Sequence, residues 1–131
     1  MLQDLRNALA ERATYVGSPY HTDIPKLGLR PSPRRSAMRI EDAEESGHEP
    51  DCTLCPRKWA HQPEGVQNLL RDAIRGRQFI ENGENFPYKV WARDPDDREL
   101  VYEAKASPVT GEYHGYPLTR MQSRKLPIAI P

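Results

Sequence analysis

Two histidines are the residues best suited to transfer protons near neutral pH. His21 lies in a segment rich in glycine and proline, and His114 lies in the last stretch expected to form a strand. Because an imidazole titrates close to neutrality, one ring can remove the 2′-hydroxyl proton of RNA while the other protonates the leaving 5′-oxygen. This pair predicts metal-independent ribonuclease chemistry, provided that the beginning and the end of the chain meet.

Lys105 and Tyr113 are the expected helpers that face the phosphate. A cation beside the two histidines would stabilise the charge that develops on the phosphorane, by about 10²-fold in rate when it is preorganised. Taken singly, each of these residues also fits an ordinary surface or packing role. Only their convergence on one cleft would favour catalysis.

A second group of residues has the spacing of metal ligands. His48, Cys52, Cys55 and His61 form the pattern His-x3-Cys-x2-Cys-x5-His. Two thiolates two residues apart can hold one Zn²⁺ from a tight turn, and a histidine on each side would complete a tetrahedral shell. The alternative is two free thiols in a polar loop, and the sequence leaves both open.

A third feature is a run of cations broken by Pro31 and Pro33. Arginines in a stiffened, extended chain can each contact a phosphate with little loss of entropy, which favours RNA or an acidic partner surface. The alternative is a solvated linker whose charges pair with the acidic block that follows. The candidate nucleic-acid-binding residues are Arg30, Arg34, Arg35 and Arg39, with Lys26 nearby.

Composition limits the architecture that can carry these groups. The chain has 131 residues with 19 Lys and Arg against 19 Asp and Glu, so its formal charge is zero, although residues 41–55 hold acidic side chains and no Lys or Arg. Only 37% of residues are apolar and no long apolar run occurs, which argues against a membrane-spanning helix and against a large doubly wound nucleotide-binding sheet. We therefore expect one soluble, cytoplasmic domain.

The periodicity of apolar residues predicts two helices and three strands. Helical spacing covers residues 2–13, and a clearer helix begins at Pro63 and ends near Gly76. Alternating patterns predict strands over 86–93, 100–106 and 112–118, the first two forming a hairpin. Residues 119–131 form a tail, and its last part, Leu126-Pro127-Ile128-Ala129-Ile130-Pro131, is apolar enough to dock on the body or on another molecule.

These elements predict an α+β fold in which two helices pack on a small antiparallel sheet of three or four strands. Residues 14–62 are rich in proline and are expected to be irregular, with the zinc knuckle as their anchor, and residues 63–118 are expected to form the helix and the antiparallel meander.

Four short motifs lie along the chain outside the cysteine-containing insert. They are Tyr15-Val16-Gly17-Ser18-Pro19-x-His21, Phe86-Pro87-Tyr88-x-Val90-Trp91, Val101-Tyr102-Glu103 and Gly111-Glu112-Tyr113-x-Gly115-Tyr116-Pro117-Leu118. Together they resemble a small bacterial family over most of the chain outside that insert, and this resemblance implies no particular activity. The order of one helix followed by an antiparallel meander is also similar to barnase-like and colicin-like ribonuclease toxins, which implies RNA cleavage, although the cysteine and histidine pattern is not part of those toxins.

Two functions from different classes follow. The first is a small toxin-like ribonuclease that uses His21 and His114 without a metal and takes RNA as its partner. The second is a non-catalytic module in which zinc orders the loop, while Trp59, Trp91 and the apolar tail contact a protein or nucleic-acid partner. Loss of RNA cleavage on substitution of the histidines would favour the first, and bound zinc with chelator-sensitive partner binding the second.

Overall fold

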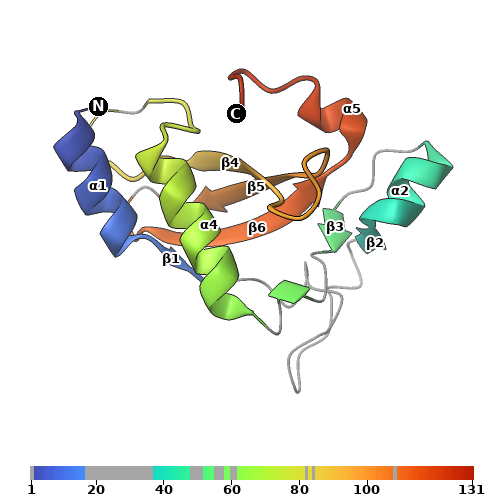
Figure 1. The fold of residues 1–131 in the computed structure, drawn as a ribbon, viewed down its shortest axis with the longest axis horizontal. Coiled ribbons are helices and arrows are strands. Elements are labelled where there is room, and N and C mark those ends of the chain that lie inside the picture. The colour runs from blue at the N-terminus through green and yellow to red at the C-terminus, as the bar shows by residue number, and fades with distance from the viewer. Residues whose placement is uncertain are drawn as a thin grey trace.

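The computed structural model describes residues 2–16, 37–47, 52–54, 58–59, 62–81, 83, 85–107 and 109–131. These residues form an α+β fold, as the sequence predicts. The elements are α1 (Gln3–Arg12), β1 (Thr14–Tyr15), β2 (Ala37–Arg39), α2 (Ile40–Ser46), β3 (Cys52–Leu54), α4 (Pro63–Arg75), β4 (Lys89–Arg93), β5 (Val101–Ala106), β6 (Glu112–Leu118) and α5 (Arg120–Ser123) (Figure 1).

The main sheet has four strands in the order β1-β6-β5-β4. Strands β4, β5 and β6 form the expected antiparallel meander, with Lys89 opposite Lys105 and Lys105 opposite His114. Strand β1 pairs with β6 in parallel, so that Tyr15 lies opposite Tyr113. The N-terminal and C-terminal parts of the chain therefore meet in one sheet.

Helices α1 and α4 cover one face of this sheet, which we call the inner face (Figure 1). Helix α4 carries Pro63 in its first turn, where the missing N–H costs nothing. Its apolar stripe is buried against the sheet, as its spacing predicts. The core between the two layers comprises Leu9, Ala10, Ala13, Leu70, Ala73, Ile74, Phe79, Phe86, Val90, Ala92, Ala104, Ala106 and Tyr113.

The prediction of two helices and a purely antiparallel sheet needs correction. The described residues contain four helices, and the sheet is mixed because β1 runs parallel to β6. The segment 14–62, expected to be irregular, contains β1, β2, α2 and β3. Strands of two or three residues are too short to show an alternating pattern, and α2 buries only Ala43 among its seven residues, so neither produces a periodic signal.

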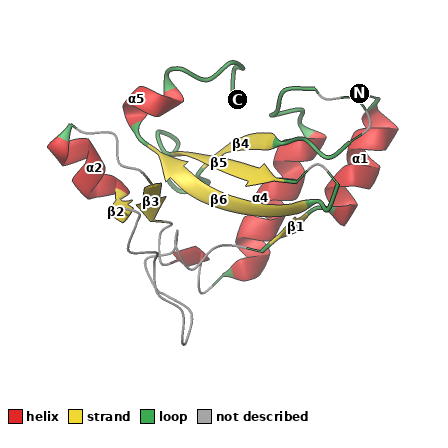
Figure 2. Cartoon of the chain, turned by 180° about the vertical axis from the view of Figure 1, so that it is seen from behind, coloured by secondary structure: helices red, strands yellow, loops and turns green. Residues whose placement is uncertain are grey.

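A small second sheet holds α2 against the main body. Strands β2 and β3 pair in parallel, and the Thr53 hydroxyl donates a hydrogen bond to the carbonyl of Pro117 in β6. A second contact involves α2 itself, because the backbone N–H of Arg120 donates to Glu44 Oε1 at 2.5 Å. Both contacts attach this unit near the end of β6, as Figure 2 shows from behind.

The outward side of β1 is covered by a side chain rather than by another strand. Gln67 of α4 donates from Nε2 to the carbonyl of Ala13 at 2.9 Å and accepts from the N–H of Tyr15 at 2.8 Å. Arg71 Nε also donates to the carbonyl of Ala13, at 3.3 Å. The amide of Gln67 thus supplies the donor and acceptor that a neighbouring strand would provide.

The C-terminal tail, residues 124–131, docks on the body of the same chain. Its aliphatic side chains, Leu126, Ile128 and Ile130, pack against Trp91, Val101 and Leu118 on the sheet face opposite the helices. This is one of the two positions that the sequence leaves open for the tail. None of the described helices has the length and apolar character needed to cross a bilayer.

Candidate functional site

The sheet face turned away from α1 and α4, here called the outer face, carries three rows of side chains. Residues directly opposite one another in an antiparallel ladder project to the same side. The rows are Lys89, Lys105 and His114; Trp91, Glu103 and Tyr116; and Arg93, Val101 and Leu118. Figure 2 shows β4, β5 and β6 from this side, with α4 and α1 behind them.

The first row, which we call the Lys–His row, brings two sequence-predicted residues together. Lys105 of β5 is the direct neighbour of His114 on β6 and of Lys89 on β4. Opposed side chains in such a ladder have Cβ atoms about 5 Å apart. His114 is exposed, and Lys89 and Lys105 are half-buried. The row therefore presents one imidazole and two ammonium groups to solvent within a single strip.

Glu103 organises the middle row. Its Oε1 accepts a hydrogen bond from Trp91 Nε1 at 3.0 Å and lies 3.9 Å from Lys89 Nζ. Its Oε2 accepts a hydrogen bond from the hydroxyl of Tyr116. Burial, followed by this hydrogen bond to a carboxylate, raises the pKa of Tyr116 above its usual value, so the phenol stays protonated. Lys105 Nζ lies 5.6 Å from the centre of the Tyr116 ring.

Tyr113 is not available to a ligand, which corrects its predicted role as a phosphate-facing helper. The side chain is fully buried in the inner-face core, and its hydroxyl donates to the carbonyl of Pro87 at 2.5 Å. Burial raises the pKa of this phenol. Because successive residues of a strand project to opposite sides, Tyr113 and His114 cannot share a face.

Most of the other predicted site residues lie outside the described residues. These are His21, Arg30, Arg34, Arg35, His48, Cys55 and His61. Arg39 ends β2 with an exposed side chain, and the backbone of Cys52 begins β3. Within the described ranges, no three His, Cys, Asp or Glu side chains gather closely enough to hold a metal ion.

Both tryptophans that the interaction-module hypothesis assigned to partner contact are buried within the chain. Trp91 is 2% exposed beneath the C-terminal tail, and Trp59 is 7% exposed. Trp59 packs edge-on against Tyr102 with ring centres 5.8 Å apart. These indoles stabilise the fold and offer little area to a second molecule.

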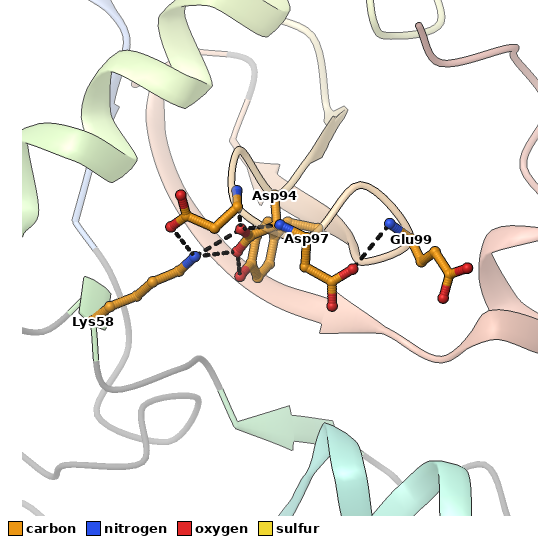
Figure 3. A network of polar contacts seen from close by, with 6 residues as sticks. Lys58, Asp94, Asp97 and Glu99 are labelled. Atoms are coloured by element: carbon orange, nitrogen blue, oxygen red, sulfur yellow. Dashed lines mark hydrogen bonds and ion pairs between the residues drawn. The ribbon is translucent and has the colours of Figure 1, made fainter.

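Sequence reasoning missed a buried ion pair at the turn between β4 and β5 (Figure 3). The Asp94 side chain is 1% exposed, and its two oxygens lie 2.7 and 2.6 Å from Lys58 Nζ. Oδ1 also accepts the backbone N–H groups of Asp96 and Asp97, at 2.8 and 3.1 Å. Oδ2 accepts the hydroxyl of Tyr102. The Asp94-Pro95-Asp96-Asp97 run predicts the turn, but nothing in the sequence indicates that Lys58 reaches it.

The pKa values of this ion pair move in opposite directions. Burial alone would raise the pKa of Asp94, but the hydrogen bonds from Lys58, Tyr102 and the Asp96 amide outweigh it and lower the pKa. Burial would lower the pKa of Lys58, and the two aspartates together raise it. Both groups are therefore charged near neutral pH, and every Asp94 oxygen has partners within the chain. The ion pair anchors residues 58–59 to the β4–β5 hairpin, and the Asp94 carboxylate is fully engaged in holding the fold together.

A scan of protein-family models and searches of curated proteins and of solved structures found no match to this chain. The chemistry of the outer face is therefore the basis for a functional conclusion.

Proposed function

We propose that the outer face binds RNA and that His114 transfers a proton in its metal-independent cleavage. The observation that carries this proposal is the Lys–His row, in which an exposed imidazole has an ammonium group as its direct cross-strand neighbour. Lys89 extends the positive charge of the row by one strand. Phosphate groups are the ligands that such a strip of cations attracts.

Each group in the row has a distinct part in this proposal. Lys89 and Lys105 bind backbone phosphates, and Lys105 stabilises the additional negative charge of the phosphorane. His114 acts as the base for the 2′-hydroxyl or as the acid for the 5′-oxygen. The Glu103 carboxylate accepts hydrogen bonds from Trp91 and Tyr116, which fixes the side chains of the neighbouring middle row. It also limits the rotamers open to Lys89.

The second proton-transfer group in the proposal is His21. The N–H of Val16 donates to the carbonyl of Tyr113 at 2.9 Å, so the described N-terminal chain ends beside β6 next to His114. His21 lies five positions after Val16, and five chain steps span at most about 18 Å. The parallel pairing of β1 with β6 thus supports a shared cleft for both imidazoles.

Cleavage of a labelled single-stranded RNA in the presence of EDTA tests this proposal. We expect His114→Ala to lower the rate by at least about 10²-fold while the thermal unfolding midpoint stays unchanged. Glu112→Ala is the matched control, because Glu112 is exposed on the same strand and faces the same side. Unaltered cleavage by the His114 variant, or cleavage that requires a divalent metal, would refute the proposal.

A structural zinc site remains a second proposal for the segment around Cys52. Its support is that the backbone of Cys52 is held by the β2–β3 pairing and that the next residue, Thr53, is bonded to Pro117. Such an anchor would give the loop a fixed base on which ligands could assemble. Elemental analysis of the purified chain tests it: about one zinc per chain is expected, and metal-free folded protein would exclude it.

A further inference from the structure

A groove opens between α5, the C-terminal tail and the hairpin formed by β4 and β5. It has a volume of about 540 Å³, which is within the range of small-molecule sites. Its aliphatic lining comes from Val101 on the sheet and from Leu126, Ile128 and Ile130 of the tail. The tail therefore forms one wall of the groove, and the end of the outer face forms another.

Among the described residues, three arginines and one acidic side chain line this groove. They are Arg93 on β4, Arg120 on α5 and Arg124 directly after α5, and the acid is Glu99. Three positive charges and one negative charge leave a net charge of +2 among the described lining residues. An apolar floor strengthens the attraction of an anion, because it excludes water from one side of the ion pair.

Contacts within the chain hold Arg93 and Arg120 in place but leave many of their N–H donors available. Arg93 donates to the carbonyls of Arg98 and Ile130, at 2.8 and 3.4 Å. Arg120 pairs with Glu99 at 3.0 Å, and Arg124 makes no side-chain hydrogen bond or ion pair with the described part of the chain. Since each guanidinium carries five donors, most of them remain unused by these contacts.

The backbone that carries two of the arginines is also fixed. Thr119 caps α5 with a complete capping box, in which its hydroxyl accepts from the Gln122 N–H at 3.2 Å and its own N–H donates to Gln122 Oε1 at 2.9 Å. This bonding orients the first turn of α5, and Arg124 follows directly as its C-terminal cap residue. The backbone on this side of the groove is thus preorganised, which lowers the entropy lost when a ligand binds.

We propose that this groove is a binding site for a phosphate group. The guanidinium fork matches the oxygens of a phosphate, and the net charge of +2 matches a dianion. The phosphate could belong to a free ligand or to the same RNA strand that contacts the Lys–His row; only this second source rests on the function proposed above. Glu99 competes with the ligand for Arg120 and is displaced when the phosphate binds.

The site is tested by titrating the full chain with inorganic phosphate while following the amide NMR signals of residues 93, 99 and 120–124. We expect Arg124→Ala to weaken phosphate binding about tenfold, because it removes a charged hydrogen-bond donor. Glu99→Gln should tighten binding about twofold, since it removes an exposed competing carboxylate. The matched control is Arg75→Ala: Arg75 pairs with Asp72 at 3.0 Å on α4, which covers the opposite sheet face.

A second titration identifies the source of the phosphate. The probe is a single-stranded RNA with methylated 2′-oxygens, which binds but is not cleaved. If inorganic phosphate at the groove weakens RNA binding, and Arg124→Ala does the same, the RNA supplies the phosphate. If RNA binds without affecting the groove signals, or does not bind at all, while inorganic phosphate still shifts them, the ligand is a free phosphate compound. Unchanged groove signals with both probes, or equal phosphate affinity in the Arg124 variant and the unmodified chain, would overturn the proposal.

Discussion

The two faces of the main sheet are built from the same strands but differ in chemistry and in cover. The inner face carries alanine, valine and tyrosine side chains buried beneath α1 and α4. The outer face carries Lys89, Lys105 and His114 at one end and a cluster of Trp91, Val101 and Leu118 under the tail at the other. Strand β6 contributes to both faces with adjacent residues.

This difference separates the residues that form the helix-covered core from the more exposed residues that a ligand could contact. A helix layer needs a continuous apolar surface, and the inner face supplies it. The outer face is covered where its residues are apolar, because the aliphatic side chains of the tail pack against them there. In the Lys–His row, His114 is exposed and both lysines are half-buried, so we expect substitutions there to change function much more than stability.

Neighbouring positions on β6 give the largest expected contrast. Tyr113→Ala removes a fully buried ring and the hydrogen bond to Pro87, and we expect the free energy of unfolding to fall by about 3–5 kcal/mol. His114→Ala, one residue away and exposed, should change it by less than about 0.5 kcal/mol. Denaturant titration of both variants measures the difference, and similar losses would contradict the assignment of the two faces.

The ion pair at the β4–β5 turn should show the next largest effect. Lys58→Met leaves the buried Asp94 carboxylate without its cation, and we expect a loss of about 2 kcal/mol, below the range for fully buried pairs because the Lys58 side chain is 29% exposed. Asp96→Asn removes the other carboxylate bonded to the same ammonium group, but Asp96 is 80% exposed, so its loss should stay within about 0.5 kcal/mol. Equal losses would show that burial of Asp94 is not what stabilises the turn.

The same pair predicts how stability depends on pH. The folded-state pKa of Asp94 is below its ordinary value of 3.8. The contribution of Asp94 to the free energy of unfolding is therefore complete above pH 3.8 and is lost as the pH falls through the folded-state pKa. Because the pKa of Lys58 is above 10.5, its contribution is complete below 10.5 and is lost as the pH rises through its folded-state pKa. Unfolding free energies measured across this range should form a plateau between about pH 5 and 10, and Lys58→Met should reduce the difference between plateau and acid limb.

Two glycines with positive φ allow the cost of backbone strain to be separated from the cost of a steric clash between an added Cβ and its neighbours. Gly111 has φ +69°, and a Cβ there would lie 2.6 Å from the Phe86 ring of the inner-face core; Gly83 has φ +79° with open space around it. We expect Gly83→Ala to lower the unfolding free energy by about 1 kcal/mol through backbone strain alone. Gly111→Ala should cost clearly more, as measured by thermal unfolding. Equal shifts would mean that the Phe86 ring moves aside without loss.

The smallest change in stability is expected in the Lys–His row. Lys89→Gln and Lys105→Gln should each alter the unfolding free energy by less than about 0.5 kcal/mol. If each lysine contacts one phosphate, each variant should reduce the slope of log affinity against log salt concentration by about 0.7 for single-stranded RNA. Fluorescence anisotropy at several salt concentrations measures this slope. If the slope does not change in a variant, that lysine does not contact a phosphate of the RNA.

The elements with strong periodicity were predictable from the sequence. Helix α4 buries Val66, Leu70, Ala73 and Ile74, the apolar positions of its helical spacing. The first five residues of β6 alternate between less and more buried positions, as its pattern predicts, and the alternation stops at Pro117 and Leu118, which are both buried. Strand β1 could not be predicted from the sequence, because it has only two residues. It pairs with β6, where Tyr113 lies opposite Tyr15 but far from it along the chain. Its pairing is decided by tertiary contacts, including the side-chain amide of Gln67, which leave no local pattern.

The candidate site was predictable only in part. Alternation along β5 and β6 places Lys105 and His114 on one face, and the same alternation should have excluded Tyr113 from it. The roles of Glu103 and Lys58 depend on partners on other elements, in particular Trp91 and Asp94. A sequence pattern indicates the direction of a side chain on its own strand, but not which distant group will satisfy it.

The glutamine amide beside β1 also affects how the molecule behaves at high concentration. An unpaired border strand offers its peptide groups to any foreign extended chain, which is a common first step toward fibrils. Gln67 bonds the N–H of Tyr15 in β1 and the carbonyl of Ala13 directly before it, and on β4 the carbonyl of Gln78 accepts the N–H of Trp91 at 2.9 Å. A single glutamine in a helix thus helps to keep neighbouring copies of the chain from being recruited into a growing sheet.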